Sequence, residues 1–277
     1  MATSSAKSVR RPPMMLEVVR TQLVTPGMRR ITLTGDMLKG FPEDSHGAHI
    51  KILLPREGQD KPVLPTLGPK GPIWPPADVR PIARTYSVRR FDVMLNELDV
   101  DFVLHGDNGP ASAWVSRVQP GDFVGVAGPG GPKPMLGEAE WYLMAGDMTA
   151  IPAISALLEI MPESAAGQVF IEVPNSDEIQ TIQHPAGVEV SWLIREEKDP
   201  IKSHQLINAV TALDWPSGSA FAWVAGENSS VLSIRKYLRT ELKLERHQFY
   251  AVPYWRSCFT EEAYHQERHE IMDNIDT

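Results

Sequence analysis

The sequence predicts two domains of different class, an antiparallel β-barrel of six strands followed by a parallel α/β sheet. Six strand-like segments with hairpin-type connections fill the first half, whereas strands and helices alternate in the second half. A segment rich in glycine and proline, GPGGPKPMLGEAE, separates the two patterns. We therefore divide the chain into a disordered tail at 1–13, a barrel domain at 14–135 and an α/β domain at 136–277.

The barrel is predicted from strand-like segments broken by turn residues. The Pro-Gly turn in TPGM follows the first segment and is typical of connections between antiparallel strands. The six predicted strands lie in MMLEVVRTQLV, RRITLTG, AHIKILLP, RTYSVRRF, ELDVDFVLH and GDFVGVAGP, with a short helix in ASAWVSRV between the last two. The stretch Pro55–Pro81 is too rich in proline and glycine for regular structure, and it is either a functional loop or a plain solvent loop.

The α/β domain is predicted from strands that alternate with helices, the pattern of a Rossmann-like sheet with right-handed crossovers. The predicted strands lie in EWYLMAGD, GQVFIEVPN, VEVSWLIRE, SAFAWVAGE and HQFYAVPYW. The predicted helices lie in IPAISALLEIMP, SHQLINAVTALDW and SSVLSIRKYLRTELKL, and the first of them has a proline near its start.

Composition excludes several function classes. The net charge of −8 argues against a general nucleic-acid binder, which usually carries a basic footprint. The single cysteine, Cys258, cannot form an intrachain disulfide, which fits a reducing compartment. No apolar run approaches the roughly 18–20 residues that span a bilayer, and MATSSAKSVRRPP lacks the apolar core of a secretory signal. We therefore expect a cytoplasmic protein without membrane insertion.

The segment ARTYSVRRFD combines strand-forming residues with three arginines. Alternation along a strand places Arg84 and Tyr86 on one face, and Thr85 and Ser87 on the other. A cation, a phenol and a hydroxyl so close together suggest a ligand that contains both a phosphate and a ring, because Arg84 can form charge-assisted hydrogen bonds to a diphosphate. An exposed strand with ordinary cross-strand partners is the alternative.

The segment DFVLHGDNGPASAWV supports the same ligand. Gly109 allows close approach of the backbone, and Pro110 suits the first turn of a helix. The N–H groups of Ala111 and Ser112 would then open a helix, where phosphate oxygens bind readily. Two alternatives stay open: the Ser112 hydroxyl caps the helix instead, and His105 is a strand-end histidine bonded to backbone.

These segments together resemble the siderophore-interacting protein family of FAD-dependent ferric-chelate reductases, within the ferredoxin–NADP reductase superfamily. The resemblance is carried by RTYSVRRFD, DVDFVLHGDNGPASAWVSRVQPGDFVGVAGPGG, AGDMTAIPAI, WVAGENSSVLSIRKYLR and YWRSCFTEEAYHQERHE. It implies that the barrel binds FAD and that the second domain resembles an NAD(P)H-binding domain. The residues that the resemblance implies for the cofactor site are Arg84, Thr85, Tyr86, Ser87, Asp101, His105, Gly109, Pro110, Ala111, Ser112, Asp147, Thr149 and Trp255.

The turn AGDMTAIPAI lies where dinucleotide-binding sheets place a phosphate loop. It lacks both G-x-G-x-x-G and the G-T-G-x-x-P of typical ferredoxin reductases, so the sequence leaves NAD(P)H and reduced ferredoxin open as electron donors. Asp147 and Thr149 either face the flavin or nicotinamide, or they only cap the helix at Ile151. Trp255 either stacks on the flavin or is a core tryptophan.

The resemblance further implies a ferric siderophore as substrate, bound by a basic cluster. Such chelates are bulky and frequently anionic, so cations in an acidic protein would concentrate them. The candidates are Lys51, Lys133 and Arg256, each of which is otherwise an ordinary surface charge. No side chain is expected to be catalytic, because the flavin supplies the chemistry.

Two further groups stay ambiguous. After Glu227, the helix carries Arg235, Lys236 and Arg239, which either meet a 2′-phosphate or an acidic electron donor, or form a solvated helix face. His265 and His269 are four residues apart on a predicted helix, but no third ligand accompanies them, so we expect no metal site.

The resemblance therefore implies a ferric-siderophore reductase that releases iron(II). One alternative is a flavin or ferredoxin-type reductase with another acceptor, and another is a non-catalytic module that binds siderophore or flavin. A monomer is expected from the resemblance, with ferredoxin as a further candidate partner.

Overall fold

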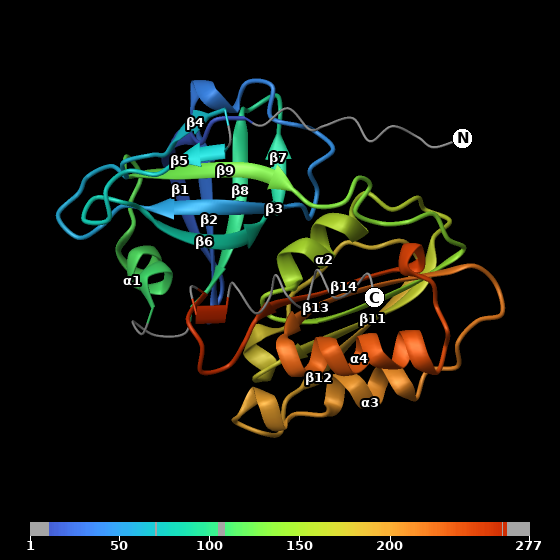
Figure 1. Ribbon diagram of the computed structural model, residues 1–277. Coiled ribbons are helices and arrows are strands. Elements are labelled where there is room, and N and C mark those ends of the chain that lie inside the picture. Colours follow the sequence, from blue (N-terminus) through green and yellow to red (C-terminus); the bar gives the residue numbers. More distant parts are fainter. Residues whose placement is uncertain (1–10, 70, 105–108, 262, 265–277) are drawn as a thin grey trace.

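An antiparallel sheet and a parallel sheet lie side by side in the computed structural model (Figure 1), which describes residues 11–69, 71–104, 109–261 and 263–264. The strands are β1 (Met14–Thr25), β2 (Met28–Thr34), β3 (His49–Leu54), β4 (Thr66–Gly68), β5 (Gly71–Ile73), β6 (Ile82–Ser87), β7 (Arg90–Asp92), β8 (Glu97–Val103), β9 (Phe123–Gly130), β10 (Trp141–Asp147), β11 (Ala166–Val173), β12 (Gly187–Ile194), β13 (Ala220–Glu227) and β14 (Phe249–Trp255). The helices are α1 (Pro110–Arg117), α2 (Ile151–Leu158), α3 (Gln205–Thr211) and α4 (Asn228–Thr240).

The first sheet is barrel-like, as predicted, but it has seven strands instead of six and does not close. Its order is β6-β3-β9-β1-β2-β8-β7, with antiparallel pairing throughout. The two edge strands, β6 and β7, are consecutive in the chain, so the sheet must curl until its edges almost meet. Alternate residues point inward and form one core, with Leu16, Ile31, Ile52, Val100 and Val124 among its members.

The extra strand arises because the predicted strand RTYSVRRF is two strands. The N–H of Val88 donates to Ala48 O at 2.8 Å, next to β3, whereas the N–H of Arg89 donates to Asp99 O at 3.0 Å on β8. The chain therefore changes its pairing partner between Val88 and Arg89. Val88 is fully buried at this corner. A buried, β-branched residue at this position fits the pattern of one continuous strand, so the sequence does not indicate the break.

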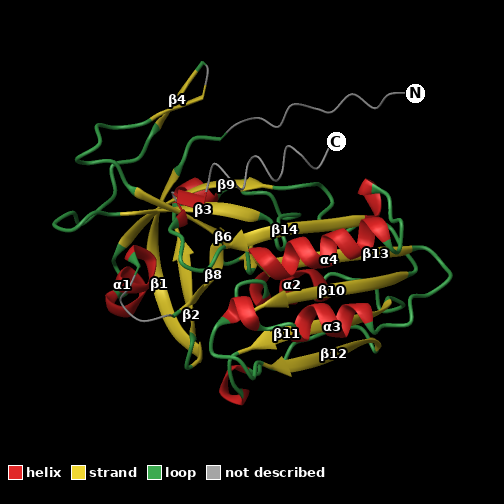
Figure 2. Cartoon of the chain, turned by 60° about the horizontal axis from the view of Figure 1, so that its bottom comes forward, coloured by secondary structure: helices red, strands yellow, loops and turns green. Residues whose placement is uncertain are grey.

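The proline-rich stretch Pro55–Pro81 contains some regular structure, contrary to the prediction. β4 and β5 pair as a short antiparallel hairpin, with Thr66 opposite Ile73. The hairpin projects away from the barrel (Figure 2). Its strands are only three residues long, which is too short to show an alternating pattern among the surrounding prolines.

The second sheet is the predicted parallel α/β sheet, in the order β12-β11-β10-β13-β14. Helix α2 packs on the face towards the barrel, where Ile154 and Leu157 share a core with Trp223. Helices α3 and α4 cover the other face (Figures 1 and 2). The chain runs outward from β10 to β12 and then returns to β13 on the opposite side of β10. The carboxyl ends of β10 and β13 therefore flank the point where ligands bind in such sheets.

A buried carboxylate joins the two sheets. Glu178, in a turn after β11, accepts hydrogen bonds from Thr25 Oγ1 at 2.5 Å and from the Gly27 backbone at 3.1 Å, both at the end of the β1–β2 hairpin. Met28 of the same hairpin is fully buried in the core beneath α2. This contact is one of those that hold the barrel against the α/β domain.

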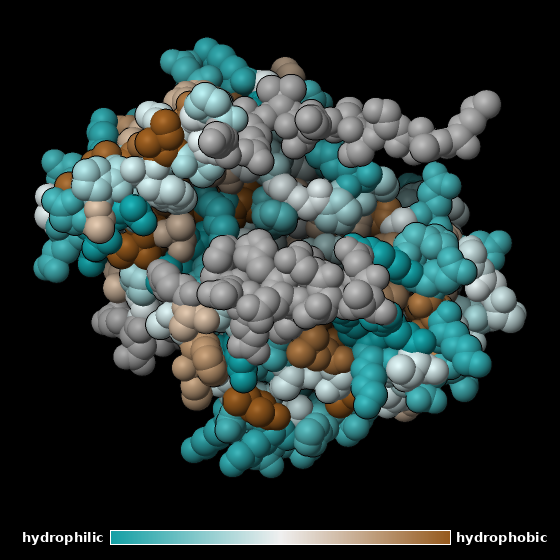
Figure 3. Space-filling model, viewed as in Figure 1, coloured by the Kyte–Doolittle hydropathy of each residue, from teal (hydrophilic) through white to brown (hydrophobic). Residues whose placement is uncertain are grey.

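The surface in Figure 3 is mostly hydrophilic, with small separate apolar areas. Among the described residues, no helix is both long enough and apolar enough to cross a membrane.

Candidate functional site

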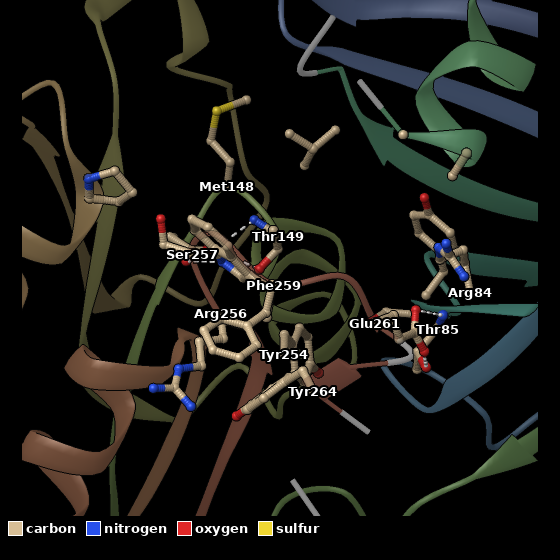
Figure 4. A pocket seen from close by; sticks show the side chains of 18 of the residues that line it. Arg84, Thr85, Met148, Thr149, Tyr254, Arg256, Ser257, Phe259, Glu261 and Tyr264 are labelled. Atoms are coloured by element: carbon tan, nitrogen blue, oxygen red, sulfur yellow. Dashed lines mark hydrogen bonds between the residues drawn. The ribbon is translucent and has the colours of Figure 1, made fainter. Parts of the chain in front are cut away.

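A cavity of about 590 Å³ lies where the barrel meets the α/β domain. Its size is that of a pocket for a cofactor or a small ligand. Its walls come from β6, β8 and the start of α1 on one side, and from the carboxyl ends of β10, β11 and β14 on the other (Figure 4). The predicted site residues that line it are Arg84, Thr85, Tyr86, Ser87, Asp101, Gly109, Pro110, Ala111, Asp147, Thr149, Trp255 and Arg256.

On the barrel side, β6 is an edge strand, so one row of its backbone groups has no partner strand. The Tyr86 ring packs against Phe102 with their centroids 4.2 Å apart, which fixes the phenol between the core and the cavity. Burial raises the pKa of Tyr86 well above its usual value, so the phenol stays protonated. Arg84 donates to Ala83 O at 2.8 Å and lies at the cavity wall (Figure 4).

The opening of α1 has no side-chain cap. Gly109 is the N-cap and Pro110 follows in the first turn. The Ser112 hydroxyl is buried and has no hydrogen-bond partner among the described residues, so the prediction that it caps the helix is wrong. A buried hydroxyl without a hydrogen-bond partner is energetically costly, and Ser112 directly follows Ala111, which lines the cavity.

Two other predicted residues differ in status. His105 lies outside the described residues. Asp101 is buried, and its carboxylate accepts two hydrogen bonds from Arg30, at 2.6 and 2.8 Å. Arg89 lies 4.0 Å from the same carboxylate. Asp101 lines the cavity, but its charge is already compensated by these arginines.

On the α/β side, four donors converge on Asp147 at the end of β10. Oδ1 accepts from the backbone N–H and the hydroxyl of Thr149, at 2.8 and 2.6 Å. Oδ2 accepts from the Glu227 backbone and from Trp255 Nε1, both at 2.8 Å. Burial raises the pKa of Asp147, and these hydrogen bonds oppose the rise because they favour the carboxylate. The carboxylate thus ties the ends of β10, β13 and β14 together.

The capping alternative for this turn is wrong. The N-cap of α2 is Ala150, and no side chain caps the helix. The Thr149 hydroxyl is engaged by Asp147 instead. Both residues line the cavity at the switch point of the sheet.

The predicted basic cluster is only partly assembled. Arg256 lines the cavity, where its guanidinium lies 4.2 Å from the centre of the Phe259 ring. Lys51 reaches the cavity wall through Thr85, to which its Nζ donates at 2.5 Å. Lys133 does not line the cavity, and it pairs with Asp44 at 2.7 Å on an exposed part of the barrel.

Sequence reasoning missed two carboxylates in the cavity. Glu172, at the end of β11, is buried and accepts from Ser203 Oγ at 2.6 Å. Glu261 follows β14 and accepts from the backbone N–H of Thr85 at 3.0 Å. Glu172 could have been predicted from its position at the end of β11, because the parallel pairing of β10 and β11 places Glu172 beside Asp147. No local signal could have indicated Glu261, because its partners lie on the other domain.

The arginines of α4 lie outside this cavity. Lys236 and Arg239 are exposed, as a solvated face requires, but Arg235 is buried. Burial and the nearby charges of Arg239 and Arg246 lower the pKa of Arg235 to about 10. The prediction that the three residues form one solvated face is therefore wrong for Arg235.

Comparison with known proteins accounts for both halves of the chain. Residues 17–133 match a family model described as siderophore-interacting FAD-binding domain, and residues 139–258 match one described as siderophore-interacting protein. The ferric vibriobactin reductase ViuB of Vibrio cholerae is 44% identical over 264 residues, covering 94% of this chain and 96% of that protein. The chain belongs to the siderophore-interacting protein family.

Solved structures of the siderophore-interacting protein family agree with this assignment. The protein SipS of Aeromonas hydrophila superposes with a TM-score of 0.83 at 42% identity, covering 95% of this chain and 98% of that one. The NADPH-dependent ferric-chelate reductase of Escherichia coli is 28% identical over 246 residues, covering 87% of this chain and 92% of that protein. The predicted family resemblance is confirmed.

The fold is shared with more distant proteins. The ferredoxin–NADP⁺ reductase of Plasmodium falciparum has a TM-score of 0.62 at 11% identity, covering 87% of this chain and 96% of that one. In this siderophore-interacting protein, a flavoprotein by its FAD-binding domain, the cavity lies at the junction of the two matched regions.

Proposed function

We propose that the protein is an FAD-dependent ferric-siderophore reductase whose site is the cavity between the two domains. The observation that carries the proposal is that Arg84 and the first residues of α1, from Gly109 to Ala111, line the same cavity. Arg84 on β6 and the unpartnered, buried Ser112 hydroxyl in the first turn of α1 belong to the two segments that suit a diphosphate. The family match supplies the cofactor that such a donor set fits.

The residues of the cavity wall divide into roles along the FAD molecule. Arg84 and the first backbone N–H groups of α1 would hold the diphosphate, and the buried Ser112 hydroxyl, next to the lining residue Ala111, would be a further donor. Tyr86 and Ser87 on β6 would meet the ring system, with Trp255 on the opposite side of the cavity. Bound FAD supplies the redox chemistry, because it accepts two electrons and releases them singly.

The chain itself contributes position and electrostatics. Asp147 holds the Trp255 indole by its Nε1, so this ring cannot swing freely into the cavity. Arg256 lines the cavity from the α/β domain, and Lys51 contacts the cavity-lining Thr85 on the barrel. Their positive charge would attract an anionic ferric chelate. Lys133, outside the cavity lining, would act only at longer range.

Two electron donors are compatible with the site. One curated relative, the ferric-chelate reductase of E. coli, is described as NADPH-dependent. The turn at Asp147 lacks the glycine pattern of a phosphate loop, and its oxygens already accept four hydrogen bonds. Reduced ferredoxin therefore stays a candidate donor beside NAD(P)H.

An anaerobic titration tests the proposal. NADH, NADPH or reduced ferredoxin is added in turn to the purified protein while the flavin absorbance is followed, and a ferric siderophore is then added with an iron(II) trap. Bleaching by one donor, and recovery with release of iron(II), is the expected result. A flavin that no ferric chelate reoxidises would indicate a reductase with another acceptor, and a protein without flavin would indicate a binding module.

A further inference from the structure

A carboxylate from the end of the chain reaches across the cavity to the barrel. Glu261 follows β14 of the α/β domain, yet its side chain lies against β6 beside Thr85 (Figure 4). Its Oε1 accepts from Lys51 Nζ at 2.8 Å and from the Thr85 hydroxyl at 2.5 Å, and its Oε2 accepts from the Thr85 backbone at 3.0 Å. Glu261 thus neutralises Lys51, one of the cations on which the proposed attraction of the substrate depends.

Glu261 is charged in this position. Burial would raise the pKa of Glu261, but the charge of Lys51 and the hydrogen bonds from Lys51 and Thr85 outweigh burial and lower it. The Glu261 side chain is 20% exposed and that of Lys51 is 32% exposed, so the ion pair is partly open to solvent. Pairs of this kind contribute little net stability, because desolvation and ordering cancel much of the attraction.

Other contacts already hold this part of the chain. The Ser257 backbone donates to Glu227 Oε1 at 3.3 Å, and the Tyr264 hydroxyl donates to Asn228 Oδ1 at 2.8 Å. Tyr264 is also buried, with 2% of its surface exposed. The segment therefore has anchors at the end of β13 and the start of α4 that do not depend on Glu261, and the ion pair can open without releasing the whole segment.

We propose that Glu261 is a specificity-determining residue, an internal carboxylate that occupies Lys51 and that an anionic ferric chelate must displace. The inference rests on the proposed function. An anionic donor group of a chelate, such as a catecholate oxygen, would replace the Glu261 carboxylate at Lys51 Nζ. A neutral chelate gains nothing from this exchange, so Glu261 sets how strongly the site discriminates between chelates by charge.

The test measures binding without turnover. The oxidised, FAD-loaded protein is titrated calorimetrically, in the absence of any electron donor, with a trianionic ferric tris-catecholate and with a neutral ferric tris-hydroxamate. Glu261→Gln retains an oxygen for the Thr85 backbone but removes the charge. We expect it to lower the Kd for the tris-catecholate about fivefold and to leave the Kd for the tris-hydroxamate unchanged.

Two controls separate this effect from a general change of charge. Glu97→Gln removes an equal charge from the ion pair with Arg20 on the barrel surface, and should leave both Kd values unchanged. In a Lys51→Met background, Glu261→Gln should no longer tighten binding. Glu261→Ala serves if the glutamine variant unfolds at a lower temperature, and it should shift the Kd in the same direction.

An unchanged or higher Kd for the tris-catecholate in the Glu261 variants, with normal binding by the parent protein, would overturn this inference alone. Failure of the parent protein and of every variant to bind either chelate would overturn the proposed function, and this inference with it.

Discussion

The Trp255 indole donates from Nε1 to Oδ2 of Asp147 at 2.8 Å, which joins the last residue of β14 to the last residue of β10. Thr149 and Glu227 donate to the same carboxylate. An amide at position 147 would point an N–H₂ group at donors that need an acceptor. We expect Asp147→Asn to lower the free energy of unfolding by about 2 kcal/mol, measured by urea denaturation.

The matched control for this prediction is Trp255→Phe, which removes one donor and keeps an aromatic ring. It should cost about 1 kcal/mol, since the carboxylate retains three of its hydrogen bonds. A loss as large as that of Asp147→Asn would mean that ring packing, and not the carboxylate, holds this corner.

Gly226 permits the close approach of β13 to Asp147. Its φ is +141°, and a Cβ there would lie 2.7 Å from Asp147 Oδ2. We expect Gly226→Ala to destabilise the protein by about 3 kcal/mol in urea denaturation, from strain and collision together. Gly121, with φ +95° and nothing within 4 Å of its Cβ position, provides the control. Gly121→Ala should lose only about 1 kcal/mol, and equal losses would remove the collision from the explanation.

Replacement of Ser112 by alanine should not harm the stability of the flavin-free protein, but it should weaken the binding of FAD. In the flavin-free protein the buried Ser112 hydroxyl is unpartnered within the described residues, so Ser112→Ala should leave the melting temperature unchanged or raise it. In the same variant the Kd for FAD should rise about tenfold, because a hydrogen bond to phosphate is lost. The exposed Ser116 on the same helix supplies the control variant, Ser116→Ala, whose FAD affinity should not change. A Ser112→Ala protein that binds FAD normally would show that this hydroxyl meets no phosphate.

Arg84 should be the strongest single contributor to retention of the flavin. Loss of charge-assisted hydrogen bonds in Arg84→Ala should weaken FAD binding by about tenfold to a hundredfold, measured by fluorescence on dilution. Arg90→Ala removes an arginine from the adjoining β7, where it pairs with Asp92 at 2.9 Å, and should retain full occupancy. Full flavin occupancy in Arg84→Ala would contradict the diphosphate assignment.

Arg235 should be replaceable with a gain in stability. Arg235 is buried. Burial, together with the nearby charges of Arg239 and Arg246, lowers the pKa of Arg235 to about 10. A methionine retains much of the apolar stem without the desolvated charge, so Arg235→Met should raise the free energy of unfolding by about 1 kcal/mol. The exposed Arg239 gives the comparison, since Arg239→Met should gain less. A loss of stability in Arg235→Met would mean that its charge is compensated in the fold.

Much of the fold follows from local pattern. Strand–helix alternation from Trp141 onward, with turn residues between the elements, predicts the five parallel strands β10–β14 and the helices α2, α3 and α4 of the described residues. The pattern fails where pairing decides the element. Arg84–Phe91 reads as one strand, and only the change of partner at Val88 divides it. β4 and β5 are too short for any periodicity.

The candidate site is predictable to the extent that its residues are neighbours in the chain. Arg84 to Ser87 and Gly109 to Ser112 form two compact motifs, so each suggests a phosphate-containing ligand from its own residues, and the family resemblance implies the rest of the site. The burial of Arg235 is not predictable from the sequence, because the charged residues around it on the helix resemble an ordinary solvated face.

By itself, then, the sequence determined the two-domain architecture, the family and the two motifs that suit a diphosphate, since each depends on residues a few positions apart. Tertiary structure alone decided that four donors meet at Asp147 and that Glu261 binds Lys51, a residue 210 positions earlier in the chain. The contacts of Asp147 depend on how β10, β13 and β14 are arranged in one sheet, and the contact of Glu261 depends on how the two domains pack against each other. Neither arrangement is encoded in a local pattern.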